Sequence, residues 1–259
     1  MTKVMGIVNV TPDSFSDGGR YFSPDQAIAR ARNMVEEGAD MIDLGGESTR
    51  PGATPIGWEE EWARLEPVLR GLAPVLRGLA PRGSEGPVPI SVDTYHPETA
   101  ERAVAAGAKI VNCVMAAPVP QMLDICAKGG AELVLPARLS GSDPEKPQRL
   151  SVDDSILTGP VPVYLDPMIG FGTTREEDLA LLRSIPELAK RGRVLVGASR
   201  KRIVKKLTGE KVTGKNLGGN LGIAVWCAMN GASVVRVHDV AETVQALRVV
   251  AALGAGGAN

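Results

Sequence analysis

Short apolar runs alternate with longer, helix-like stretches along the whole chain. Several junctions share one pattern, in which a helix-like stretch ends at Gly-Ala plus one polar residue and a short apolar run follows. Glycine tolerates the left-handed conformation that ends helices, and a short apolar run suits a strand buried on both faces. The copies begin at Gly38, Gly107, Gly130 and Gly231, and they predict repeated helix-to-strand units.

Further apolar runs bring the expected number of strands to about eight, which is the strand number of a (β/α)8 barrel. The predicted strands are Val4–Val10, Met41–Leu44, Val88–Val92, Ile110–Val114, Leu133–Leu135, Pro162–Leu165, Val194–Val196 and Val234–Val237. The length of 259 residues suits one such domain, and no strongly charged or Ser/Gly-rich linker divides the chain. We therefore expect a single α/β (β/α)8 TIM barrel over residues 1–259, with long loops after strands 1 and 2.

Proline positions modify the expected helices. The tandem repeat over residues 67–80 reads as an expansion of an outer helix, and Pro74 is expected to kink or break that helix. Residues 175–190 also read as a helix that Pro186 should disturb, whereas residues 217–229 read as an uninterrupted helix.

Polar residues lie within or at the C-terminal ends of the predicted strands, where a barrel collects its catalytic groups. They are Asn9, Asp43, Asp93, Asn112, Asp166, Arg236 and His238. Any one of them taken alone is equally well explained as a turn residue or a satisfied core residue. Because buried polar groups need partners, the whole set favours one shared binding site.

Composition limits the possible functions. The 29 Lys and Arg residues nearly balance 30 Asp and Glu, so the formal charge of -1 gives no general attraction to nucleic acid or an anionic membrane. The three scattered cysteines favour a reducing compartment, and two histidines cannot build a histidine-rich metal site. His96 precedes a proline and reads as a turn residue. Because no long apolar segment is present, we expect a cytoplasmic protein.

Basic residues gather near the last two predicted strands. Arg200, Lys201 and Arg202 open an expected helix, while Arg236 and His238 lie on one side of the eighth strand. Cations and free backbone N–H groups at a helix start suit an anion. A solvated basic helix start is the alternative explanation for Arg200 and Arg202.

Acceptors suited to a flat heterocycle lie on other strands. Asp93, Asn112 and Asp166 offer two carboxylates and one amide, which match a ring edged by amino and N–H groups. The glycine-rich stretches at residues 11–19 and 45–52 read as a mobile flap and as a loop that allows close backbone approach. The sequence therefore predicts one pocket with an anionic end and a heterocycle end.

These motifs together resemble dihydropteroate synthase. The matching segments follow that family's order and are residues 8–19, 45–52, 91–94, 166–167 with 170–172, 199–201 and 236–239. The resemblance implies an enzyme that joins 4-aminobenzoate to 6-hydroxymethyl-7,8-dihydropterin pyrophosphate, with Mg2+ assistance, and releases pyrophosphate in folate synthesis. It also implies a homodimer.

The resemblance assigns roles to individual residues. Pterin binding would fall to Asp93, Asn112, Asp166 and Lys201, and pyrophosphate binding to Asn9, Arg236 and His238. Asn9 would also meet the metal, and the catalytic set would be Lys201, Arg236 and Asp17. Aminobenzoate would be framed by Phe15, Thr49, Arg50, Pro51, Ser199 and Arg202.

Three positions depart from the family pattern. Cys113 follows Asn112 where the family usually has Asp, residues 135–139 replace a Met-His stretch, and Arg202 stands where many members have Ser. Two other functions stay open: a pterin-binding barrel that passes a methyl group to a corrinoid, and a non-catalytic pterin-binding relative. The methyl-transfer enzyme would not need the motifs at residues 48–52, 199–201 and 236–238 together.

Overall fold

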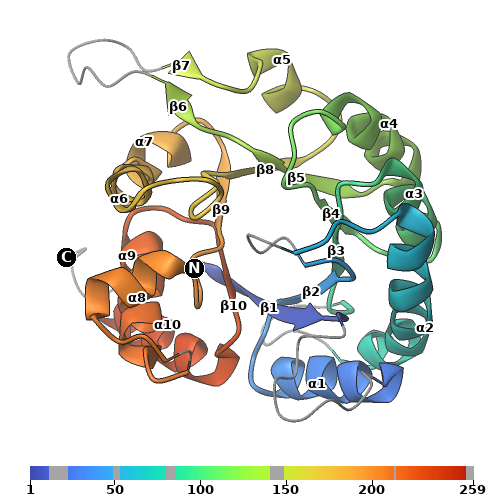
Figure 1. Ribbon diagram of the computed structural model, residues 1–259, viewed down its shortest axis with the longest axis horizontal. Coiled ribbons are helices and arrows are strands. Elements are labelled where there is room, and N and C mark those ends of the chain that lie inside the picture. Colours follow the sequence, from blue (N-terminus) through green and yellow to red (C-terminus); the bar gives the residue numbers. More distant parts are fainter. Residues whose placement is uncertain (12–22, 49–52, 80–85, 141–148, 213, 255–259) are drawn as a thin grey trace. The chain divides into compact units, whose positions relative to one another are not determined.

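The strands of the protein follow the order of a closed barrel, β1-β10-β9-β8-β5-β4-β3-β2. The computed structural model describes residues 1–11, 23–48, 53–79, 86–140, 149–212 and 214–254. The barrel strands are β1 Lys3–Asn9, β2 Met41–Gly45, β3 Ile90–Asp93, β4 Ile110–Asn112, β5 Glu132–Pro136, β8 Val163–Asp166, β9 Arg193–Val196 and β10 Val234–Val237. Each overlaps one predicted run, so the (β/α)8 fold is confirmed (Figure 1). Contacts group the chain into residues 1–5 with 134–259 and residues 6–133; the single domain stays a prediction.

Residues 6–133 form the first compact unit, in which helices α1 to α4 flank strands β2 to β4 (Figure 1). The helices are α1 Pro24–Glu36, α2 Trp58–Arg77, α3 Pro97–Ala105 and α4 Val119–Gly129, and each packs on the next. The strand register pairs Gly45 with Asp93 and Asp93 with Asn112. The polar ends of these three strands therefore lie at one level.

Helix α2 continues through both Pro67 and Pro74, so a break at Pro74 is wrong and only the expected kink stays a prediction. Its inward face buries Leu65, Val68, Leu69, Leu72 and Leu76 almost completely. Each proline removes one helical hydrogen bond, but burial of a whole apolar face outweighs a local preference of that size. Tertiary packing therefore decides the length of this helix.

Residues 1–5 and 134–259 form the second unit. Its helices are α5 Asp154–Leu157, α6 Arg175–Arg183, α7 Ile185–Ala189, α8 Arg202–Thr208, α9 Leu217–Met229 and α10 Val240–Gly254. The predicted disturbance at Pro186 is confirmed, since α6 ends and α7 begins beside Ser184. Strands β6 Leu139–Ser140 and β7 Arg149–Leu150 pair antiparallel and form a separate two-stranded sheet. Within the described ranges, no helix is long and apolar enough to span a membrane.

The barrel strands are buried on both faces, which is why short apolar runs in the sequence predicted them. Every residue of β2, β4 and β8 is buried, as expected for parallel strands that are covered on both faces. Polar side chains inside these strands are buried as well, including Asp43, Asn112 and Asp166. Their contacts define the candidate site.

Candidate active site

Asp166 ends strand β8 and is only 6% exposed. Its Oδ1 atom accepts a 2.7 Å hydrogen bond from the amide of Met168. Burial raises the pKa of Asp166, while the charges of Lys201, Arg236 and Arg138 and the Met168 bond oppose that rise. The carboxylate therefore lies in a dry site next to cations, where an N–H donor from a ligand would stabilise its ionised form.

Lys201 lies against the turn that follows Asp166. Its Nζ atom donates to the carbonyl oxygen of Ile169 at 2.7 Å and lies 4.3 Å from the ring centroid of Phe171. Gly170 has φ of 80°, and a Cβ atom there would come within 3.0 Å of Lys201 Cδ. Glycine thus permits both the backbone conformation and the close approach of the lysine.

Arg236 shares the region of Lys201. A Cβ atom at Gly197, one residue beyond β9, would lie 3.7 Å from Arg236 Cδ and 4.0 Å from Lys201 Nζ. His238 is joined to Ser199, whose Oγ atom lies 3.1 Å from His238 Nδ1 and accepts from the His238 amide at 3.3 Å. The structure therefore brings the predicted residues of this unit together at the ends of β8, β9 and β10.

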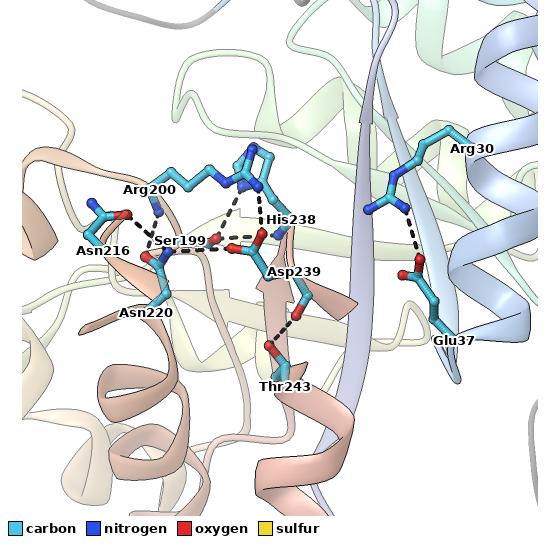
Figure 2. A network of polar contacts seen from close by, with 9 residues as sticks. All are labelled: Arg30, Glu37, Ser199, Arg200, Asn216, Asn220, His238, Asp239 and Thr243. Carbon is cyan, nitrogen blue, oxygen red and sulfur yellow. Dashed lines mark hydrogen bonds and ion pairs between the residues drawn. The ribbon is translucent and has the colours of Figure 1, made fainter. Parts of the chain in front are cut away.

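The other two arginines of the predicted cationic cluster bind protein groups. Figure 2 shows the Arg200 guanidinium paired with the Asp239 carboxylate, and the Arg200 amide donates to Asn220 Oδ1 at 2.9 Å. The Arg202 guanidinium donates to the carbonyl oxygen of Thr173. The Arg200 guanidinium is thus paired within the protein, and the anion contact considered from sequence stays a prediction.

In the other unit, the predicted acceptors lie on neighbouring strands. Asn112 Nδ2 lies 3.4 Å from Asp43 Oδ2, and the register sets Asn112 beside Asp93. Asn112 is 2% exposed, and its Oδ1 atom has no hydrogen-bond partner among the described residues. A buried acceptor in this state is a position for a ligand donor.

Asn9 provides a further oxygen at the end of β1. A Cβ atom at Gly45 would lie 3.6 Å from Asn9 Oδ1 and 4.0 Å from Asp93 Oδ2, so both oxygens face the same bare backbone. Oxygen donors with room for water or phosphate suit Mg2+. No group of three or more His, Cys, Asp or Glu side chains in the described part of the chain is arranged to hold a metal.

Glu47 ties together the loops after β2 and β3. Its carboxylate accepts from Tyr95 Oη at 2.7 Å and from the Ile56 amide at 3.4 Å, and it lies 3.2 Å from His96 Nε2. Burial and the neighbouring Glu47 raise the pKa of Tyr95. His96 is the N-cap residue of α3 and has an extended backbone, so it lies at a helix start and not within a turn as the sequence predicted.

A buried acid supports this region from α2. Glu61 is fully buried, and Thr94 Oγ1 donates to its Oε2 atom at 2.6 Å. Burial raises the pKa of Glu61, and the Thr94 hydroxyl opposes that rise. The Thr94 hydroxyl is therefore expected to contribute to the stability of the fold.

Thr94→Val should lower the free energy of unfolding by about 1–3 kcal/mol, because it leaves a buried acceptor without its donor. The loss should be larger at pH 7 than at pH 4, because the Thr94 hydroxyl lowers the pKa of Glu61 and therefore stabilises the ionised carboxylate more than the protonated acid. Urea denaturation at both pH values measures this difference. Exposed Thr158→Val is the matched control, and equal losses in the two variants would contradict the assignment.

Some predicted residues lie outside the described residues: Phe15, Asp17, Thr49, Arg50 and Pro51. Their roles stay predictions. Cys113 is described and buried, and its Sγ atom donates to the Met115 carbonyl oxygen at 3.1 Å. Burial raises the pKa of Cys113 to about 11, so this position carries a neutral thiol at pH 7.

Sequence reasoning missed several residues that organise the site. Asn220 and Glu61 were not singled out, although each has a defined contact, and Arg138 was noted only as part of the departure at residues 135–139. Asn220 left a weak signal, since it is an amide between glycine and leucine in an otherwise apolar helix. Arg138 donates to the carbonyl oxygens of Met168 and Phe171 at 3.4 and 3.3 Å, which its sequence position does not indicate.

The sequence matches a family of known proteins over most of its length. The family described as pterin binding enzyme matches residues 5–158 and 158–238. The dihydropteroate synthase of Staphylococcus haemolyticus is 39% identical over 252 residues, covering 92% of this chain and 90% of the relative.

Solved structures give the same result. A Xanthomonas albilineans dihydropteroate synthase with 4-aminobenzoic acid superposes with a TM-score of 0.82 at 38% identity, over 98% of this chain and 94% of that chain. The same enzyme in complex with 7,8-dihydropteroate gives 0.78 at 34% identity, with the same coverage. The chain therefore belongs to the dihydropteroate synthase family of pterin-binding enzymes and is a transferase of folate synthesis.

Proposed function

We propose that the chain condenses 6-hydroxymethyl-7,8-dihydropterin pyrophosphate with 4-aminobenzoate to give 7,8-dihydropteroate and pyrophosphate. The observation that carries this proposal is the buried Asp166 carboxylate beside Lys201 and Arg236. That arrangement offers an acceptor for a heterocycle next to cations for an anionic leaving group. The relatives crystallised with 4-aminobenzoic acid and with 7,8-dihydropteroate support this choice of substrate and product.

We assign recognition of the pterin to Asp93, Asn112, Asp166 and Lys201. Carboxylate oxygens accept from the amino and ring N–H groups, and the Oδ1 atom of Asn112, which has no partner within the described ranges, offers one more acceptor. The positive charge that develops on the pterin as the leaving group departs is stabilised by the carboxylates. The ammonium of Lys201 donates to the Ile169 carbonyl oxygen in the turn after Asp166. It can exchange that acceptor for a substrate atom.

The chemistry is a substitution at the methylene carbon of the pterin. The amine nitrogen of 4-aminobenzoate forms a bond to this carbon, the carbon–oxygen bond breaks, and pyrophosphate leaves with the bonding electron pair. The nitrogen then loses a proton. Arg236 and His238 are assigned to the pyrophosphate, and the reaction requires no covalent bond to the enzyme.

Mg2+ is proposed as the cofactor because the donor set near Gly45 consists of oxygen atoms. Asn9 would hold the ion through its amide oxygen. Bound Mg2+ would neutralise part of the charge of the pyrophosphate.

The aminobenzoate end is assigned to Phe15, Thr49, Arg50 and Pro51 with Ser199 and Arg202, and Asp17 is kept as a catalytic candidate. The described residues on either side of positions 49–52 are joined directly, because the Glu47 carboxylate accepts from the Ile56 amide, and Glu47 also accepts from Tyr95 Oη in the loop after β3. Exclusion of water from the site would protect the reactive methylene carbon from hydrolysis.

An assay with both substrates and Mg2+ tests the proposed reaction. Purified protein should release pyrophosphate only when both the pterin pyrophosphate and 4-aminobenzoate are present, and 7,8-dihydropteroate should accumulate in equal amount. Binding of the pterin without pyrophosphate release would support a non-catalytic relative instead. Methyl transfer from a methylated folate to a corrinoid would support the other alternative.

A homodimer in the cytoplasm is the proposed state of the protein. Trp226 and Met229 on α9 are 47% and 70% exposed, and Val249 and Leu253 on the adjacent α10 are 60% and 76% exposed. Exposed apolar side chains on neighbouring helices favour a protein contact. The free, buried cysteines suit a reducing compartment. Light scattering should give twice the chain mass of 27.2 kDa, and a monomer mass at micromolar concentration would refute the dimer.

A further inference from the structure

Arg200 has an unusual backbone conformation for its residue type. Its φ angle is 59°, and Met168 is the other non-glycine residue with positive φ among those described. Side chains with a Cβ atom disfavour this left-handed region, so surrounding contacts must hold it. Arg200 stands between Ser199 and Lys201, which both belong to the candidate site.

Two contacts hold Arg200 in this conformation (Figure 2). Asn220 Oδ1 accepts the backbone amide of Arg200 at 2.9 Å, and the Asp239 carboxylate binds the guanidinium. Asn220 is 8% exposed, and its Nδ2 atom lies 3.5 Å from both Asp239 Oδ2 and Asn216 Oδ1. One buried amide on α9 therefore contacts the backbone of the β9 loop and the carboxylate of the β10 loop.

The direction of the chain at Arg200 determines where its neighbours point. On one side, the Ser199 hydroxyl contacts His238. On the other, the Lys201 amide donates to Ala198 at 3.2 Å, and the Lys201 side chain extends to Ile169. A change of φ at Arg200 would turn these two side chains relative to each other.

We propose that Asn220 is a positioning residue for the reaction, because its amide holds Arg200 in the left-handed conformation that orients Ser199 and Lys201. This inference rests on the proposed role of Lys201. The backbone amide of Asn220 donates to the Asn216 carbonyl oxygen, as expected in a helix. The side-chain oxygen Oδ1 is therefore not needed to form α9. The side chain instead stabilises the adjacent loop.

Asn220→Ala tests the proposal against a matched substitution on the same helix. Asn230 caps the far end of α9, where its Nδ2 atom donates to the Trp226 carbonyl oxygen at 2.8 Å. Both substitutions remove one amide and one bond to the backbone. Asn220→Ala should lower kcat/KM for the pterin pyrophosphate on the order of 10–100-fold, as expected for misplacement of a reacting group. Asn230→Ala should stay within about twofold of the unmodified protein, because it is away from the loop.

A conservative variant separates positioning from stability. Asn220→Gln keeps a carboxamide that can accept the Arg200 amide and donate to Asp239, so it should retain more of the kcat/KM than Asn220→Ala does. If Asn220→Ala does not fold, Asn220→Ser replaces it, because its shorter side chain cannot reach the same amide and should show the same loss. Unchanged kcat/KM in the folded Ala or Ser variant would overturn the proposal.

The Lys201→Ala variant separates a failure of the proposed role of Asn220 from a failure of the proposed role of Lys201. An inactive Lys201→Ala with a fully active Asn220→Ala would overturn only the role of Asn220. Full activity of Lys201→Ala would refute the proposed role of Lys201, and the positioning role would fall with it. A crystal structure of Asn220→Ala should show Arg200 out of the left-handed region, and an unchanged φ would count against the proposal.

Discussion

Lys201→Ala is expected to lower kcat/KM by at least about 100-fold, which is typical for loss of one preorganised charged donor. The side chain is half-buried, and its ammonium bonds a turn carbonyl and faces the Phe171 ring. It fills little of the apolar core, so the fold should remain intact. Steady-state kinetics with both substrates, together with the circular dichroism melting curve, measure the two effects.

Lys206→Ala is the matched control for this prediction. Lys206 lies in the last turn of α8, the helix that Lys201 precedes as its N-cap residue, and Lys206 is exposed. Its removal changes the net charge by the same amount but should leave kcat/KM within about twofold, as is usual for surface substitutions. Comparable losses in both variants would indicate a general charge effect and would contradict a specific role of Lys201.

Asp166→Asn is expected to weaken pterin binding by about 10–100-fold, since a hydrogen bond to a charged group contributes about 1.5–3 kcal/mol. Asparagine keeps an oxygen that can accept from the Met168 amide, so the turn should be preserved. Isothermal titration calorimetry with the pterin measures the change. An unchanged dissociation constant would mean that this carboxylate is structural.

The raised pKa of Asp166 also predicts how pH acts on binding. Ionised Asp166 should bind the pterin N–H groups, so affinity should fall as pH decreases through a value above the ordinary range of Asp. Asp166→Asn should lack this dependence. At neutral pH the folded protein bears the cost of ionising a buried carboxyl, and folding of the free protein should therefore be more favourable in Asp166→Asn. A lower melting temperature for this variant would contradict that sign.

The sequence predicted the barrel because its strands are covered on both faces. Such strands appear as short apolar runs, and β2 and β8 matched the predicted runs to within one residue. Local rules also located the break at Pro186 and the full extent of α9. They failed in α2, where packing of the leucine-rich face carries the helix through Pro74. The β6 and β7 strands have two residues each, too few to show an alternating pattern.

The candidate site was predicted as residue types at strand ends, and its internal contacts were not. Arg200 and Lys201 are adjacent in the sequence, yet one is paired with Asp239 and the other lies on a turn carbonyl. Arg200 also has a left-handed backbone, which no residue pattern indicates. Asn220 and Thr94 likewise act through partners that are distant in sequence. Only the three-dimensional arrangement separates a ligand contact from a structural one.

A crystal structure with the pterin pyrophosphate and Mg2+ bound shows directly where the two ends of the substrate lie. Asp166 and Lys201 should contact the pterin ring together with Asp93 and Asn112, and Arg236 should bind the pyrophosphate. A pterin bound away from Asp166, or a pyrophosphate that does not contact Arg236, would refute the proposed site.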